Sequence, residues 1–323
     1  MKSERIIWLD RAKGIGIVLV IVLHLTSGTV NHMISSFVMP LFFFLSGYVE
    51  SRSGLKFGTF LYKELKTRIV PYFLLASVLI LFSTLYNKWD FMTVGFTIQH
   101  VLIQKRSWTI WFLACLVCVE ICFWILNHVF HDIRVIVGIS FVLFILGYTY
   151  YFYGGTPLFW NFDVAFMALS FYSMGKMCYY KYIHGINSFT ICIIIWLLCF
   201  WSNYLFTGQT LDMGGSMYGL FPITFIGAMF GINSIVILAK NMESRILAYI
   251  GKNSLLIFAL HNVIYRVLVN DILKKFNIDF AMTGIMILLK GILILIMALF
   301  ISYLVNKSKS IISKLYNKGR IMQ

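Results

Sequence analysis

The chain has 323 residues, of which 60% are hydrophobic and only 12% are charged. Soluble domains average about a quarter charged residues, so this composition excludes an ordinary soluble protein. The formal net charge is +15, from 27 Lys and Arg against 12 Asp and Glu. These basic residues cluster at the ends of long apolar runs, which is the positive-inside pattern of membrane proteins rather than a nucleic-acid-binding pattern. We therefore expect a lipid bilayer as the environment and no nucleic acid as a partner.

The apolar runs predict an all-α, polytopic membrane protein with about ten spans of roughly 20 residues each. A β-barrel is disfavoured because the runs are continuous rather than alternating. Basic residues at both termini and in alternate connections place both termini in the cytoplasm. We expect a membrane domain over 1–306 and a basic cytoplasmic tail over 307–323. The expected spans are 14–30, 33–49, 69–86, 109–128, 134–153, 162–180, 187–206, 217–239, 253–270 and 282–305.

Two segments depart from a simple series of straight spans joined by short loops. The second span contains Pro40 and Gly47, which predict a broken or re-entrant helix. The connection from Asn87 to Trp108 holds some 20 residues, and a loop of this length is usually functional or disordered. It is a candidate cover for an outward-facing site.

The six cysteines all lie in apolar runs. Cys115, Cys118 and Cys122 share one helix face, but no second CxxC pair or histidine completes the ligand spacing of a zinc site. We interpret the cysteines as packing residues and expect no metal.

His24 is the first candidate for chemistry, because it lies in the far half of the first apolar run. It shares a helix face with Lys13, about 16 Å away along the axis at helical rise. Ionisable groups inside a membrane are costly and indicate function by default. A histidine there is suited to act as a general base or a transient acyl carrier, while the alternative is an interhelical hydrogen bond.

His261 lies nine residues past Lys252, about 13 Å from the predicted inner edge. His24 and His261 are thus expected at comparable depth, on helices that enter from the same side. Two imidazoles at one level indicate a shared polar cavity, and an isolated interhelical bond remains the alternative.

A cationic cluster at the inner ends of the first and third spans is suited to a phosphate-bearing ligand such as coenzyme A. Positive-inside charge predicts the same cluster without any ligand. Asp10 lies within the first cluster as a helix cap, a salt-bridge partner, or a residue that orients an imidazole or a cationic pocket. The donor-site candidates are Arg68, Lys66, Lys13 and Arg11.

Four other ionisable groups lie within or near the spans. Glu120 and Lys290 are candidates for a structural pair, while Asp163 and Arg266 lie near predicted outer ends, where they would face an acceptor. Trp111 is first an interfacial aromatic and secondly a surface for stacking a sugar. The candidates for an acceptor or cavity site are His261, Asp163, Trp111 and Glu120.

Six segments, in order along nearly the whole chain, resemble the membrane-bound acyltransferase-3 family, and in particular its bacterial polysaccharide O-acetyltransferase branch, which is fucose-4-O-acetylase-like. They are R-x-x-W-L-D-x-x-K-G-I-G-I at 5–17 with His24, P-L-F-F-F-L-S-G-Y at 40–48, R-I-V-P-Y at 68–72, W-F-L at 111–113, F-D-x-A-x-x-A-L-x-F-Y-x-x-G at 162–175, and G-K-N-S-L at 251–255 with His261. The family's proline after the fourth motif is Ala114 here, and its second arginine upstream of Arg68 is missing.

This resemblance implies a multi-pass enzyme of the bacterial cytoplasmic membrane, with His24 as the catalytic histidine and with Asp10 and Arg68 near it or near the acyl donor. The implied reaction moves an acetyl group from acetyl-CoA to a hydroxyl of a surface polysaccharide or a lipid-linked sugar. Acetyl-CoA is then a co-substrate, and no tightly bound cofactor is expected. A glycan or lipid transporter, a scaffold for polysaccharide assembly, and a homo-oligomer all remain open alternatives.

Overall fold

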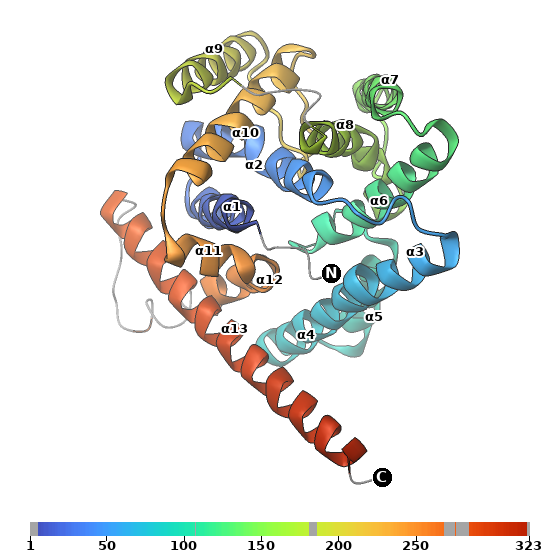
Figure 1. The fold of residues 1–323 in the computed structure, drawn as a ribbon. Coiled ribbons are helices and arrows are strands. Elements are labelled where there is room, and N and C mark those ends of the chain that lie inside the picture. Colours follow the sequence, from blue (N-terminus) through green and yellow to red (C-terminus); the bar gives the residue numbers. More distant parts are fainter. Residues whose placement is uncertain (1–5, 107, 181–185, 268–274, 276–283, 322–323) are drawn as a thin grey trace. The chain divides into compact units, whose positions relative to one another are not determined.

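The computed structural model describes residues 6–106, 108–180, 186–267, 275 and 284–321, with side chains up to 308 (Figure 1). Within these ranges the regular structure is helical, and the β-pairing is a single bridge between Asp212 and Met217. The chain divides into two compact units. Unit 1 comprises 1–27 with 243–323, and unit 2 comprises 28–242.

Unit 1 is built around α1 (Ile7–Leu25), which packs against the other three helices of the unit. The expected span of 14–30 is therefore displaced towards the N-terminus, and His24 lies in the last turn of α1 rather than in mid-helix. The helix ends because Thr26 adopts an extended backbone, while its hydroxyl donates to the carbonyl of Val22 at 2.9 Å. The other helices are α11 (Arg245–Lys252), α12 (Ser254–Tyr265) and α13 (Gly284–Ile321).

Two glycines bring α1 and α11 into backbone contact. A Cβ atom on Gly14 would lie 2.1 Å from the carbonyl oxygen of Leu247, and one on Gly251 would lie 1.7 Å from that of Asp10. No larger residue fits either position without moving a helix, so this crossing sets the register of α1 on α11.

A sharp bend of 80° separates α11 from α12. Asn253 lies at the bend, where its amide nitrogen donates to the carbonyl of Tyr249 at 2.9 Å. Its amide oxygen accepts from Asn306 of α13 at 3.0 Å. The expected ninth span of 253–270 thus begins at a bend that side-chain hydrogen bonds hold in place. Helix α13 runs on past residue 307, so no helix end marks the expected start of the tail.

In unit 2, α8 is the central helix, since it packs against α2, α6 and α7, while α10 joins α2 to α9. The bounds are α2 (Thr29–Tyr48), α3 (Phe57–Glu64), the π-helical turn η1 (Leu65–Ile69), α4 (Val70–Asn87), α5 (Phe91–Ile103), α6 (Trp111–Phe130), α7 (Ile133–Phe152), the 3₁₀ turn η2 (Phe159–Asn161), α8 (Phe162–Tyr179), α9 (Phe189–Thr207) and α10 (Ile223–Asn241).

The expected break in the second span is wrong, because α2 is continuous through Pro40. The proline is buried where α2 packs on α8 and α10, and such protein cover tolerates the backbone carbonyl that a proline leaves without a donor. Gly47 has the packing role instead: its Cβ would lie 1.9 Å from the carbonyl oxygen of Tyr172.

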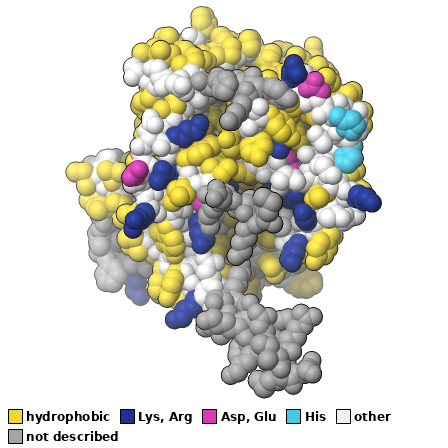
Figure 2. Space-filling model, viewed as in Figure 1, with side chains coloured by type: hydrophobic (Ala, Val, Ile, Leu, Met, Phe, Trp, Pro, Cys, Tyr) yellow, Lys and Arg dark blue, Asp and Glu magenta, His cyan; other side chains and the backbone are white. Residues whose placement is uncertain are grey.

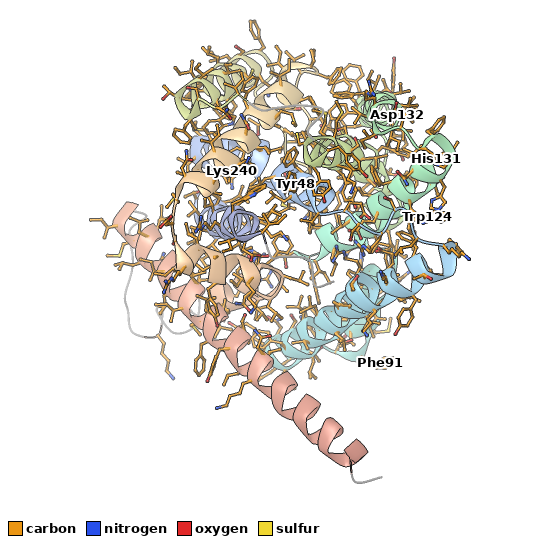
Figure 3. The ribbon with its side chains drawn as sticks, in the orientation of Figure 1. Tyr48, Phe91, Trp124, His131, Asp132 and Lys240 are labelled. Atoms are coloured by element: carbon orange, nitrogen blue, oxygen red, sulfur yellow. The ribbon has the colours of Figure 1, made fainter. Side chains whose placement is uncertain are left out.

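The expected long loop from Asn87 to Trp108 is also wrong, since most of it forms α5. Asp90 caps this helix by accepting from the backbone N–H of Thr93 at 2.9 Å, and hydrogen bonds from Thr93 lower the pKa of the Asp90 carboxyl. Phe91 in the first turn is 89% exposed and points away from the helix bundle (Figure 3).

Among the described residues, seven helices are long and apolar enough to cross a membrane: α2, the continuous segment from α3 to α4, α6, α7, α9, α10 and α13. The bent pair of α11 and α12 would make an eighth span. Helices α1 and α8 have a similar length but carry charged residues, such as Asp10 and Asp163. Apolar side chains cover much of the visible surface (Figure 2), as expected for a membrane protein.

Candidate functional site

The structure brings His24 and His261 together in unit 1. Their ring centroids lie 4.8 Å apart, with the rings tilted by 42°. His24 is exposed, whereas His261 is only 1% exposed. His24 follows Gly14 by ten residues along α1, about 15 Å at helical rise, while His261 lies on α12, beyond the 80° bend that follows Gly251.

The second histidine has a defined hydrogen-bonding state. His261 Nδ1 lies 2.7 Å from the carbonyl oxygen of Phe258. A carbonyl only accepts, so Nδ1 carries the hydrogen and Nε2 is the acceptor of the neutral ring. That Nε2 is buried without a hydrogen-bond partner. His24, in turn, lies at the C-terminal end of a helix dipole, which favours an imidazolium there.

The polar residues Asp10, Arg11 and Lys13 lie at the opposite end of α1. All three are partly exposed, and Arg11 has a buried Nε without a hydrogen-bond partner. Asp10 precedes His24 by fourteen residues, about 21 Å along the helix. Asp10 therefore does not reach the ring of His24, and it does not cap α1, whose N-cap is Ile6. Its roles as a salt-bridge partner or in a cationic pocket stay predictions.

Unit 2 contains a buried ion network, which we define as Glu50, Arg52, Glu64, Arg68 and Glu120. Arg68 binds Glu120 with two donors, Nε to Oε2 at 3.1 Å and Nη2 to Oε1 at 2.9 Å. Arg52 Nη2 reaches the same Oε1 at 2.5 Å. The side chain of Glu120 is 1% exposed, while those of Arg68 and Arg52 are 25% and 15% exposed.

Arg52 also lies against Glu64, with Nη1 2.5 Å from Oε1. This contact is electrostatic, because neither oxygen of Glu64 has an aligned hydrogen-bond partner. Glu64 immediately precedes the π-helical turn η1 and Arg68 lies within it, and such turns are frequent at functional sites. The turn brings one acidic and one basic side chain of the same segment to Arg52 and Glu120.

The remaining carboxylate of the ion network, Glu50, joins it to α8. Glu50 Oε1 accepts from the backbone N–H of Ser53 at 2.8 Å, and Oε2 accepts from the hydroxyl of Tyr172. Lys176 donates to the backbone carbonyl of Glu50. Nearby, Trp124 of α6 donates to the carbonyl of Leu55 at 2.9 Å and lies between α6 and α3 (Figure 3).

Lys66 lies outside this network. It is exposed, and its ammonium lies 6.0 Å from the centroid of the Tyr62 ring. Among the donor-site candidates of unit 2, Lys66 is thus exposed to ligand, whereas Arg68 is largely engaged with Glu120.

A second polar cluster in unit 2 surrounds Asp163, at the start of α8. Arg106 forms an ion pair with Asp163, whose other oxygen accepts from the backbone N–H of Leu158 at 3.0 Å. Asn161 accepts from the backbone N–H of Arg106 at 2.8 Å and donates to the carbonyl of Trp111 at 3.3 Å. Trp111 is 9% exposed, which leaves little ring surface for stacking a sugar.

The sequence did not single out several residues of these clusters: Glu50, Arg52, Glu64, Arg106 and Asn161. Arg52 belongs to a basic inner connection that positive-inside charge also explains. A buried carboxylate such as Glu120 is the available signal, because it requires a cationic partner from elsewhere in the chain. Among the described residues, no group of three or more His, Cys, Asp or Glu side chains is arranged to hold a metal ion.

The acyltransferase-3 family model, described as an acyltransferase domain, matches residues 6–307. The chain therefore belongs to this family of membrane acyltransferases. Comparison with curated proteins and with solved structures gives no match. The family thus assigns the class of reaction, while the donor, the acceptor and the roles of individual residues have to be argued from the chain itself.

Proposed function

We propose that this membrane acyltransferase moves an acetyl group from acetyl-CoA to a sugar hydroxyl of a surface or lipid-linked polysaccharide, with His24 as the general base. The observation that supports this proposal is the His24–His261 pair. It places an exposed imidazole at the end of α1, against a buried imidazole of α12. Imidazole titrates near neutral pH and is the commonest general base in enzymes.

In the proposed reaction, His24 is the base. His24 accepts the proton of the sugar hydroxyl, and the oxygen attacks the carbonyl carbon of the thioester. Collapse of the tetrahedral intermediate breaks the C–S bond, and the proton on His24 passes to the leaving thiolate. The products are the acetyl ester and free CoA. The C-terminal dipole of α1 would stabilise the imidazolium formed midway, by about 0.3–1 kcal/mol. The alternative route has two steps. A ring nitrogen of His24 first takes the acetyl group from the thioester and releases CoA, and the sugar hydroxyl then takes the acetyl group from the histidine.

Cationic side chains are proposed to bind the phosphates of the donor. Lys66 is exposed, and Arg68 is partly exposed beside it. Lys13 and Arg11 form a second cationic group at the start of α1. All four belong to predicted inner ends of spans, so we propose that acetyl-CoA binds from the cytoplasm. This arrangement assumes ten spans in the bacterial cytoplasmic membrane, with both termini inside.

The acceptor is proposed to bind near Asp163, at the predicted outer end of α8. Its ion pair with Arg106 gives that end both a carboxylate and a guanidinium, which are groups that hydrogen-bond sugar hydroxyls. An acceptor that binds on the outer side would require the acetyl group to pass from the cytoplasmic donor to His24.

The deciding experiment measures O-acetylation of surface glycan by NMR in cells that lack the gene. These cells are complemented with wild type, with His24→Ala, or with His32→Ala as a matched control. His32 is a histidine of α2 in unit 2, whose Nδ1 lies 3.4 Å from the hydroxyl of Thr210. Membrane levels of the three proteins are matched.

Acetyl signal restored by wild type and His32→Ala, but not by His24→Ala, is the expected result. Restoration by His24→Ala would exclude His24 as the base. Equal signals with and without the gene would instead support a transporter, because transport neither needs nor consumes acetyl-CoA.

A further inference from the structure

The histidine pair contains a buried acceptor without a donor. His261 is 1% exposed, and its Nε2 has no hydrogen-bond partner. Its hydrogen is held on Nδ1 by the carbonyl of Phe258. A buried polar atom without a partner is costly and rare, and its retention needs an explanation.

The imidazole of His24 lies against this ring at an interplanar angle of 42°. The centroid distance of 4.8 Å is that of two aromatic rings in contact. His24 is exposed at the end of α1, so its ring has room to turn about its side-chain torsions. The buried ring of His261, in contrast, is held by Phe258 and by the packing of α12 against α1 and α13.

We infer that His261 is a positioning residue whose Nε2 accepts a hydrogen bond from one ring nitrogen of His24. This hydrogen bond fixes the tautomer of His24, because the nitrogen that donates to His261 must carry the hydrogen. The other nitrogen of His24 is then unprotonated and faces the exposed side, where a hydroxyl approaches. The inference rests on the proposed function, in which His24 is the base.

The same contact holds through the reaction. When His24 accepts the hydroxyl proton, both of its nitrogens carry hydrogens, and the one facing His261 remains paired with Nε2. His261 stays neutral and exchanges no proton in this scheme. It therefore acts as the third group that orients a catalytic base, here with an imidazole in place of a carboxylate.

Two substitutions of His261 distinguish the role of Nδ1 from that of Nε2. Asparagine in His261→Asn keeps an amide donor near the Nδ1 position for Phe258 but has no atom at the Nε2 position. Glutamine in His261→Gln reaches the Nε2 position with an amide oxygen that accepts a hydrogen bond. If His261 acts through Nε2, His261→Gln should preserve the single tautomer of His24 and His261→Asn should not.

The readout is side-chain nitrogen NMR of the full-length protein, labelled with 15N-histidine, in lipid nanodiscs. The signals of His24 are assigned by their loss in His24→Gln. Wild type and His261→Gln are expected to show one His24 tautomer, with one protonated and one unprotonated nitrogen. His261→Asn is expected to show a mixture of both tautomers. Acetyl-transfer kcat should fall about 10- to 100-fold in His261→Asn, the range for loss of a group that orients an active imidazole, at an unchanged KM for acetyl-CoA.

Identical His24 signals in wild type and His261→Asn would overturn the inference, whatever the activity. Wild type alone gives a second test that does not depend on folding of a variant. The Nε2 signal of His261 should have the shift of a hydrogen-bonded acceptor, and the shift of a free one would also overturn the inference. Full activity of His24→Ala would instead overturn the proposed base, so the two failures are distinguishable.

Discussion

The His24–His261 pair of unit 1 and the ion network of unit 2 both gather ionisable side chains in a membrane enzyme, but only the network pairs carboxylates with guanidiniums. The network matches the carboxylates of Glu64 and Glu120 with the guanidiniums of Arg52 and Arg68. The histidine pair leaves Nε2 of His261 without a partner and His24 exposed.

This difference indicates two roles of polar side chains in the protein, one in folding and one in chemistry. Paired buried charges compensate one another, and removing one partner leaves the other uncompensated, so they act chiefly on folding. An exposed imidazole, in contrast, is available for chemistry. Arg68 illustrates the lesson: its motif suggests a phosphate ligand, yet two of its donors already bind Glu120. The side chain of Arg68 is still 25% exposed, and its contact with a donor phosphate is part of the proposed function.

The largest effect is expected for His24→Gln in the purified enzyme. Loss of the base should lower kcat about 10²- to 10⁴-fold. The thermal unfolding midpoint should stay close to that of wild type, because the side chain is exposed. Turnover assays with acetyl-CoA and a thermal melt in the same detergent check both quantities. A large drop in the midpoint with activity retained would make the histidine pair structural and remove the contrast with the ion network.

For Glu120→Ala, in contrast, the main expected effect is a loss of folding stability. Removing this carboxylate leaves two guanidiniums without their shared partner, at a cost of about 3–5 kcal/mol. Replacing both members in Arg68→Met/Glu120→Met should cost less than Glu120→Ala, since no uncompensated charge remains on that pair. Denaturation in detergent gives both values. Equal melting of Glu120→Ala and wild type would refute a structural role for the pair.

A smaller effect is expected at the crossing of α1 with α11, which positions α1 and therefore His24. In Gly14→Ala the new Cβ would overlap the carbonyl oxygen of Leu247, so α1 and α11 must separate, at about 1–3 kcal/mol. The nitrogen signals of His24 should change as well. Gly138→Ala in α7 is the matched control, because its Cβ meets nothing within 4 Å. Similar effects of both substitutions would mean that the crossing does not position the pair.

The smallest effect is expected for Lys66→Gln, which removes an exposed charge at the proposed donor site. KM for acetyl-CoA should rise about 2- to 5-fold, the range of an exposed ion pair, and the rise should shrink at high salt. Lys88→Gln, at the other end of α4, removes the same charge and should leave KM unchanged. Equal shifts in both variants would indicate a general charge effect rather than a phosphate contact.

Local pattern predicted several features correctly. The apolar runs and the charge clusters indicated a polytopic helical membrane protein, and six short motifs indicated its family. The sequence grouped His24 with His261, and the structure places their ring centroids 4.8 Å apart, while their equal depth in the membrane stays a prediction. These features depend on residues near one another in sequence.

Other features required contacts between distant residues. Glu120 lies 68 residues from Arg52 and 52 from Arg68, and nothing along the chain ties these three together. The continuity of α2 through Pro40 and the helicity of α5 were missed for a related reason. Burial against α8 and α10 overrides a helix breaker, and a cap at Asp90 organises a segment that its length alone marks as a loop.

By itself the sequence determined that the chain is a helical membrane acyltransferase, with His24 as the leading candidate for the base. Hydrophobic run length and short motifs are local properties and can be read residue by residue. Only the tertiary structure decided which charges neutralise one another and which polar atom stays unsatisfied. Burial and pairing depend on the side chains that neighbouring helices bring together, and helix crossings such as that of Gly14 with Leu247 control this at the scale of single atoms.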